Sequence, residues 1–199
     1  MCSLIADSEK VMLAGLLSKS NSDAHLRQYL YNARREHGER WMDYINIFRR
    51  VADDPASTEG EYLLLPGWRD QDWQKLIAAT TPRPFKASEF VIQRGVNDRA
   101  LYLVASGMLE VGVTYIDGVS ISPLAKIGVG SVIGEQSFFD GQPRSANVFA
   151  VTDGELLCLT PEKFRELSES EPALVRDLLF ALARILSLRL RHTTFRVRR

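Results

Sequence analysis

The sequence predicts an α+β chain in which helical ends flank a mainly β middle. Apolar residues recur every three to four positions in the first fifty or so residues and again after Thr160. From about Phe85 to Leu159 the period changes to two, and turn dipeptides interrupt the pattern. Many short strands separated by tight turns indicate a sandwich or a barrel-like roll.

The composition predicts one main folded domain with an appendage. The chain has 199 residues, of which 45% are hydrophobic and 25% charged, as in ordinary globular proteins. Lys plus Arg and Asp plus Glu both number 25, so no net field draws the whole molecule to nucleic acid or to an anionic membrane.

The cysteines and the apolar runs predict a cytoplasmic protein. Cys2 and Cys158 are the only cysteines, which favours a reducing compartment over a disulfide framework. The apolar stretch 11–17 lacks the basic leader of a secretion signal. The run 178–190 is interrupted by arginines and is shorter than the ~20 apolar residues of a membrane span.

Two helices are expected before residue 53, with a linker after them. Their apolar faces are Leu26, Tyr29, Leu30 and Ala33, then Trp41, Tyr44, Ile45 and Phe48. Residues 53–60 are rich in turn formers and have no periodicity. The predicted organisation is therefore a helical extension with its linker at 1–60, the main domain at 61–192, and a basic tail at 193–199.

Helices flank the β region on both sides. Before it, residues 68–79 predict a short helix with Trp73, Leu76 and Ile77 on one face. After it, Thr160 can cap a helix whose first residue is Pro161. A longer helix is expected from about Ser170, with a broad apolar face formed by Leu174, Val175, Leu178, Leu179, Leu182, Ile185 and Leu186.

Within the β region, residues 109–115 alternate as in a half-buried antiparallel strand. Asp117-Gly118 and Asp153-Gly154 each lie between apolar runs, a pattern typical of tight hairpins.

Residues 130–146 interrupt this region with the features of an anion pocket. Gly134 permits a sharp entry into a single helical turn over 135–139, whose unpaired amides would converge on one point. The Asp140-Gly141 turn brings back Arg144, a planar cation suited to phosphate oxygens. Glu135 suits an anion site only if the ligand also carries a donor, as the ribose 2′-hydroxyl of a 3′,5′-cyclic nucleotide does.

This segment resembles the phosphate-binding cassette of the cyclic-nucleotide-binding domain family, which includes protein kinase A regulatory subunits, cyclic-nucleotide-gated channels and catabolite activators. The cassette reads Gly-Glu-aliphatic-Ala/Ser-Leu, four variable residues, then Pro-Arg-Ala/Ser-Ala, and residues 134–146 match it with the same Glu-to-Arg spacing. The likeness extends over about 64–191 and includes Gly95, Asp98, Tyr102, Gly107 and Gly130. It implies an antiparallel β-roll, a jelly-roll-like double-stranded β-helix, with C-terminal lid helices and an N-terminal helical extension.

The resemblance implies a ligand, cAMP or cGMP, and a role for each cassette residue. Glu135 would accept from the ribose 2′-hydroxyl, Arg144 would pair with the cyclic phosphate, and amides near Ser137 and Phe138 would complete the cradle. The implied ligand-binding set is Gly134, Glu135, Gln136, Ser137, Phe138, Arg144, Ser145 and Ala146. The last helix would close over the base, with Leu182, Ile185 and Leu186 as the lid positions.

The sequence also departs from the family pattern. Gln136 replaces an aliphatic residue and Phe138 replaces a leucine that packs against the moving hinge. Only about ten residues follow Leu190, so a helix-turn-helix and direct gene regulation are not expected. We therefore expect a sensor that acts on a protein partner or on a second copy through its last helix.

Alternatives remain open at this point. The roll could be a ligand-free interaction or dimerisation scaffold with a vestigial cassette, or the basic tail could bind nucleic acid. Catalysis and a metal site are not expected, because the chain contains no catalytic motif and its three histidines are not at ligand spacing.

Overall fold

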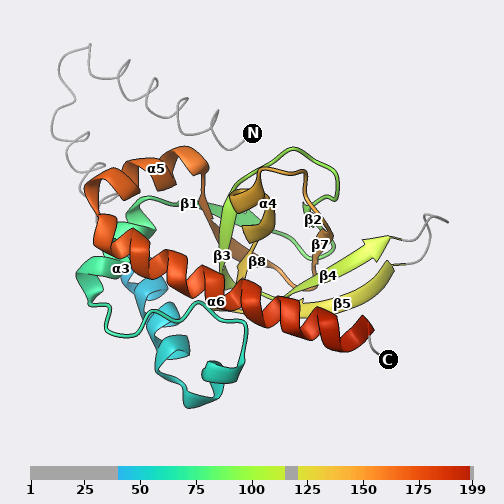
Figure 1. Ribbon diagram of the computed structural model, residues 1–199, viewed down its shortest axis with the longest axis horizontal. Coiled ribbons are helices and arrows are strands. Elements are labelled where there is room, and N and C mark those ends of the chain that lie inside the picture. Colours follow the sequence, from blue (N-terminus) through green and yellow to red (C-terminus); the bar gives the residue numbers. More distant parts are fainter. Residues whose placement is uncertain (1–39, 115–120, 198–199) are drawn as a thin grey trace, which may run out of the picture. The chain divides into compact units, whose positions relative to one another are not determined.

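Within the described part of the chain, eight strands form two antiparallel sheets that make up a β-roll (Figure 1). The computed structural model describes residues 40–114 and 121–197. The first sheet has the order β1-β8-β3-β6 and the second β2-β7-β4-β5. Their bounds are β1 (Thr81–Phe85), β2 (Phe90–Ile92), β3 (Leu101–Ser106), β4 (Leu109–Thr114), β5 (Ile121–Ile127), β6 (Val132–Ile133), β7 (Asn147–Ala150) and β8 (Gly154–Leu159).

The prediction of a hairpin at Asp153-Gly154 is wrong. The strands on either side of it, β7 and β8, belong to different sheets: β7 pairs with β2 and β4, whereas β8 pairs with β1 and β3. The dipeptide therefore carries the chain from one sheet to the other. The predicted Asp117-Gly118 turn lies outside the described residues, although β4 and β5, which flank it, do pair antiparallel.

Helices appear where the 3.6-residue period predicts them. Residues 40–53 are helical, and Tyr44, Ile45 and Phe48 are buried on one face while Trp41 stays partly exposed. The earlier predicted face, at residues 26–33, lies outside the described residues. The expected linker contains a 3-10 helix, η1 (Pro55–Glu59).

Three short helices on either side of the cassette and within it also agree with the sequence. Helix α3 (Asp70–Ala78) buries the predicted Trp73, Leu76 and Ile77. The single helical turn predicted after Gly134 is α4 (Glu135–Asp140). In α5 (Pro161–Ser170) the Thr160 hydroxyl accepts from the Lys163 amide at 3.3 Å.

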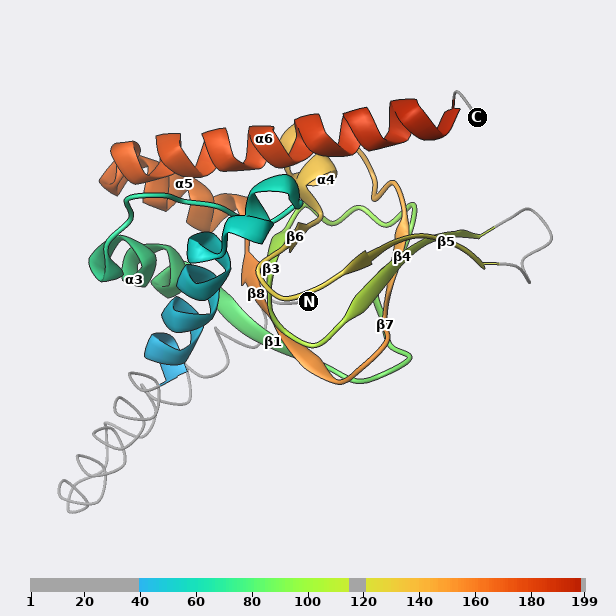
Figure 2. The same ribbon diagram turned by 90° about the horizontal axis from the view of Figure 1, so that it is seen from below.

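The last helix, α6 (Pro172–Val197), spans 26 residues and runs along one side of the roll, past α4 (Figure 2). It includes residues 193–197 of the predicted tail. Its buried Leu178, Leu182 and Ile185 share one core with the helix at 40–53, α3 and the first sheet. Trp73 stacks on Phe48 in that core, with ring centroids 5.6 Å apart. This shared core fixes α6 against the roll.

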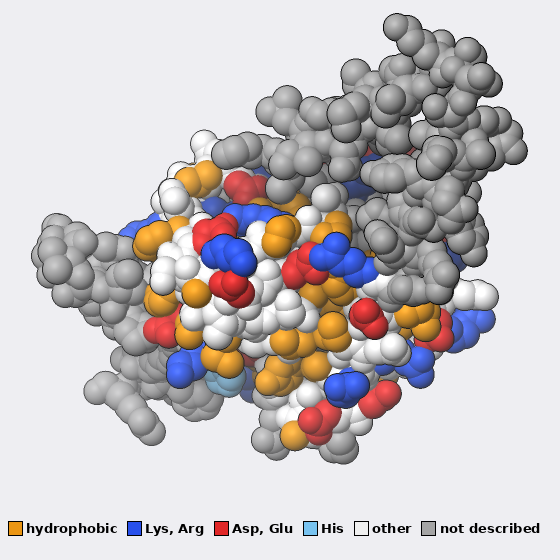
Figure 3. All heavy atoms as spheres, turned by 180° about the vertical axis from the view of Figure 1, so that it is seen from behind, with side chains coloured by type: hydrophobic (Ala, Val, Ile, Leu, Met, Phe, Trp, Pro, Cys, Tyr) orange, Lys and Arg blue, Asp and Glu red, His pale blue; other side chains and the backbone are white. Residues whose placement is uncertain are grey.

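The surface shows no segregation of charge on the face drawn in Figure 3, where acidic and basic side chains are interspersed with hydrophobic ones. This agrees with the equal numbers of acidic and basic residues in the chain.

Two of the crossings between sheets, from β3 to β4 and from β7 to β8, pack against each other at Gly107. A Cβ there would lie 2.7 Å from the Asp153 carbonyl oxygen and 2.9 Å from the Gly154 Cα, and the residue has φ +85°. We predict that Gly107→Ala destabilises the fold by about 2–5 kcal/mol, because overpacking adds to the left-handed backbone strain. Urea unfolding measures the change.

Gly67→Ala is the matched control, because Gly67 has φ +83° but open space where the Cβ would lie. Only the backbone strain of about 1–2 kcal/mol is expected there. Equal losses in the two variants would contradict the packing argument.

Candidate functional site

The cassette folds as a left-handed glycine, a short helix and a returning loop. Gly134 has φ +82°, and a Cβ on it would meet the Arg144 guanidinium and lie 2.8 Å from the Ala100 carbonyl oxygen. Glycine is therefore required for both the bend and the close approach. Helix α4 ends at Gly141, which is also left-handed, and the loop then returns to Arg144.

Arg144 is 3% exposed and held by three acceptors. Its Nη2 donates to the Asp98 carboxylate and to the Ala100 carbonyl, both at 2.6 Å. Its Nη1 donates to the Gly134 carbonyl at 2.9 Å. The guanidinium also lies 5.6 Å from the centroid of the Tyr102 ring.

The Nε of Arg144 is the exception, because it is buried and no described residue accepts a hydrogen bond from it. A buried donor without an acceptor costs about 1–3 kcal/mol. The site is therefore one acceptor short, and an anionic oxygen is the acceptor that a guanidinium binds most strongly.

Asp98 keeps the buried cation neutralised. It also accepts from the Ala100 amide at 3.0 Å and the Tyr102 hydroxyl at 3.1 Å. Burial alone would raise the pKa of the Asp98 carboxyl, but the hydrogen bonds from Arg144 and Ala100 outweigh it and lower that pKa. Asp98 therefore stays ionised and fixes the guanidinium.

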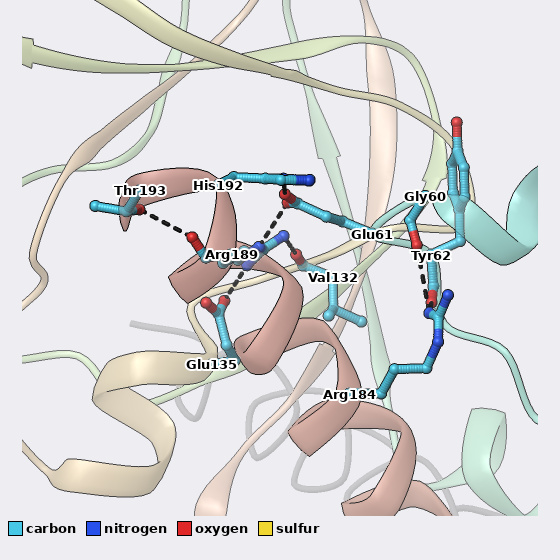
Figure 4. A network of polar contacts seen from close by, with 9 residues as sticks. All are labelled: Gly60, Glu61, Tyr62, Val132, Glu135, Arg184, Arg189, His192 and Thr193. Atoms are coloured by element: carbon cyan, nitrogen blue, oxygen red, sulfur yellow. Dashed lines mark hydrogen bonds and ion pairs between the residues drawn. The ribbon is translucent and has the colours of Figure 1, made fainter. Parts of the chain in front are cut away.

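Glu135 is 4% exposed and forms an ion pair with a residue of the last helix. The Nη1 of Arg189 lies 2.6 Å from Glu135 Oε2. Arg189 also donates from Nε to Glu61 at 2.9 Å and from Nη2 to the Val132 carbonyl at 2.8 Å (Figure 4). Burial alone would lower the pKa of Arg189, but the two carboxylates raise it above its ordinary value.

Cassette, roll and α6 together enclose a cavity of about 360 Å³. This is within the size range of small-molecule sites. Its walls are apolar side chains of the roll: Ile92, Val111, Ala125, Ile127, Ile133 and Val148. Its polar lining comes from the cassette, from Glu61, and from three residues of α6: Arg189, His192 and Thr193. An apolar body with an anionic group at one end fits this distribution of side chains.

Comparison with known proteins decides the family. The model of the cyclic nucleotide-binding domain matches residues 82–171. The chain is 38% identical over 94 residues to the cyclic AMP receptor protein of Thermus thermophilus, a match that covers 47% of this chain and 43% of that one. The N-terminal domain of a transcriptional regulator from Streptomyces coelicolor is 30% identical, with a TM-score of 0.54 and coverage of 64% of this chain and 87% of that one. The chain belongs to the cyclic nucleotide-binding domain family.

The fold agrees with this assignment. A cyclic nucleotide-binding domain from Methylobacillus flagellatus superposes with a TM-score of 0.65 at 23% identity, covering 80% of this chain and 83% of that one. The antiparallel β-roll with flanking helices, implied by the resemblance, is thereby confirmed. The matched part covers only 10% to 43% of the lengths of the first curated relatives.

The cyclic nucleotide-binding domain brings seven of the eight predicted cassette residues to the cavity: Gly134, Glu135, Gln136, Ser137, Arg144, Ser145 and Ala146. Gln136 accepts from the Ser145 hydroxyl at 2.6 Å, which ties the two sides of the cassette together.

Phe138 does not line the cavity but packs edge-on against Phe164 of α5, with ring centroids 5.1 Å apart. Its amide donates to the Gly134 carbonyl at 3.1 Å, so this amide is engaged within α4.

The predicted lid positions lie elsewhere on α6. Leu182 and Ile185 are fully buried in the core and Leu186 is half-buried, and none of the three lines the cavity. The α6 residues at the cavity begin with Arg189, about one turn beyond Ile185.

No sequence pattern points to Glu61, because this residue lies outside the cassette and far before Glu135 in the chain. Arg189 lies in the interrupted apolar run at 178–190 and His192 directly precedes the predicted tail at 193–199, so neither is predicted to belong to the site. Their spacing of three on a helix, which aligns them on one face, was the signal that could have paired them.

The described ranges, 40–114 and 121–197, contain neither a metal-ligand cluster nor a helix that could span a membrane. No group of three or more His, Cys, Asp or Glu side chains there could hold a metal ion. Over the same ranges, no helix combines the length and the apolar character that crossing a bilayer requires.

The lowered pKa of the Glu61 carboxyl predicts that the free energy of unfolding falls at acidic pH. Burial alone would raise the pKa of its carboxyl, but hydrogen bonds from Arg189 and His192 outweigh it and lower that pKa. Since the folded pKa is below the unfolded one, the stabilisation is complete above about pH 4.5 and is lost as the pH falls through the folded pKa.

We therefore expect wild type to exceed Glu61→Gln by about 1 kcal/mol of unfolding free energy at about pH 5. The gap should shrink at about pH 3. Urea unfolding at both pH values checks this, and a gap of equal size at both would contradict the assignment.

Proposed function

We propose that this domain is a non-catalytic sensor of a 3′,5′-cyclic nucleotide, cAMP or cGMP. In this proposal Arg144 binds the cyclic phosphate, Glu135 accepts from the ribose 2′-hydroxyl, and the purine occupies the apolar part of the cavity. The observation that carries the proposal is the buried Nε of Arg144, for which residues 40–114 and 121–197 supply no acceptor, in a cavity of suitable size.

Further support comes from the chemistry of the cavity. A cyclic phosphate carries one negative charge and offers oxygen acceptors for a planar cation. A carboxylate such as Glu135 can only accept hydrogen bonds, so it selects a neighbouring hydroxyl. Relatives are named for both nucleotides: the receptor of Thermus thermophilus for cyclic AMP, and a phosphodiesterase of Dictyostelium discoideum, 34% identical over 97 residues, for cGMP.

The proposed output is a change at α6 that alters contact with a protein partner. A ligand shifts a conformational equilibrium by its difference in affinity for the two states. Support for a partner surface comes from the outer side of α6, where Phe180 is 72% exposed and Leu190 69%. A second copy of this chain, as predicted from the breadth of the helix face, would be one such partner.

Arg144→Ala should weaken cyclic nucleotide binding by at least about a hundredfold, since truncating one member of a buried ionic pair costs about 3–5 kcal/mol. Isothermal titration calorimetry with cAMP and with cGMP measures the loss. Arg94→Ala, at an exposed arginine outside the cavity, is the control and should bind as wild type does. Unchanged affinity in Arg144→Ala would remove the proposed phosphate site.

The substitution Glu135→Gln should affect the binding of ribose and 2′-deoxyribose nucleotides differently. The substitution is expected to weaken binding of 3′,5′-cyclic nucleotides by about tenfold or more, since it replaces a charge-assisted hydrogen bond. Binding of the 2′-deoxy analogues should change much less, because they lack the hydroxyl. The same titrations test this, and equal losses for both ligand classes would refute the role of Glu135.

A further inference from the structure

Helix α6 holds the segment at residues 58–62 at two levels. Arg184 donates to the carbonyls of Thr58, Gly60 and Tyr62, the last two at 3.3 and 3.5 Å. One to two turns further along, Arg189 and His192 bind the two oxygens of Glu61, at 2.9 and 2.8 Å (Figure 4). The 58–62 segment follows the helix at 40–53, so α6 ties the chain before the roll to the cavity.

Arg189 joins this segment to the nucleotide site. Its three nitrogens are divided among Glu135, Glu61 and the Val132 carbonyl. The Arg189 side chain is 19% exposed and that of Glu135 5%, so the ion pair between them is shielded from water. The guanidinium lies between the two carboxylates, and all three groups line the cavity (Figure 4).

We propose that Arg189 is an internal competitor for Glu135, so that a bound nucleotide displaces it and releases the 58–62 segment. This inference rests on the proposed function, because it needs a ligand hydroxyl at Glu135. A sugar that reaches this carboxylate must enter the space that the Arg189 guanidinium occupies. Once Arg189 leaves, its bond to Glu61 is also lost, and the segment is held by fewer contacts.

Hydrogen-bond partners, rather than charge balance, favour this exchange. Arg144 is already neutralised by Asp98 at 2.6 Å, so Arg189 is the cation that balances Glu135 and Glu61. After displacement the ligand's hydroxyl binds Glu135, and Glu61 retains His192 at 2.8 Å. Neither carboxylate is left without a hydrogen-bond donor.

The two possible roles of Arg189 predict opposite effects of its removal on the affinity for the nucleotide. If Arg189 only contributed positive charge to the cavity, its removal would weaken the binding of an anionic ligand. As a competitor, its removal strengthens binding. By thermodynamic reciprocity, docking of the 58–62 segment and binding of the nucleotide then weaken each other by the same factor.

The test uses Arg189→Gln, with Arg191→Gln as the matched control. Arg191 lies on the same helix, carries the same charge and is exposed, and it does not line the cavity. Calorimetric titration with cAMP and cGMP at one salt concentration should show affinity rising at least about fivefold in Arg189→Gln, the lower end of typical coupling factors. Arg191→Gln should match wild type.

Hydrogen exchange of the 58–62 amides provides the second readout. Exchange should be slow in ligand-free wild type, fast in wild type with saturating nucleotide, and fast in ligand-free Arg189→Gln. Unchanged or lower affinity in Arg189→Gln would overturn the inference, as would slower exchange of these amides when nucleotide binds.

The experiments distinguish failure of the proposed sensor function from failure of the competitor role of Arg189. If wild type binds nucleotide in a manner that depends on Arg144 but Arg189→Gln gains no affinity, the competitor is wrong and the sensor stands. If neither protein binds either nucleotide, the proposed function fails and the inference fails with it. Binding seen only in Arg189→Gln would support both.

Discussion

The guanidinium of Arg144 is the group around which the cassette is organised. It is charged and almost fully buried, a state that proteins tolerate only when the charge is paired and its donors are satisfied. Asp98 and Ala100, just before β3, and Gly134, just before α4, supply the acceptors. These bonds join two parts of the chain that the fold must bring together, and they leave Nε as the donor for which the described residues provide no acceptor.

The same constraint explains the glycine at position 134. A side chain there would collide with the guanidinium that its own carbonyl binds. The left-handed bend, the short helix and the buried cation are therefore one unit, and each requires the others. A cavity with apolar walls next to that unit gives it the distribution of polarity that a purine nucleotide has.

Helix α6 has two different halves. Its first half is anchored in the core by Leu178, Leu182 and Ile185, which are fully buried. Its second half is held by polar contacts from Arg189 and His192 to groups at the cavity. A ligand can exchange polar contacts one for one, whereas it cannot compensate for lost core packing. Any response of α6 to the ligand is therefore expected in its second half.

Local patterns predicted much of this architecture. The buried face of α3, the Thr160 cap and the Gly134 bend depend on neighbouring residues, so they could be inferred from the sequence. The sheet crossing at Asp153-Gly154 could not, because a turn dipeptide does not specify which strands pair. Glu61 and Arg189 were missed for a similar reason: their contact depends on how α6 packs across the roll, and the lid positions implied by the family resemblance lie nearer the core.

The most direct test of the central claim is the proton–nitrogen resonance of the Arg144 Nε, assigned by its loss in Arg144→Lys and followed during titration with cAMP or cGMP. The account predicts that this resonance shifts strongly and exchanges more slowly with water as the nucleotide saturates, because Nε gains a phosphate oxygen as acceptor. A resonance that stays unchanged while the nucleotide binds would contradict it.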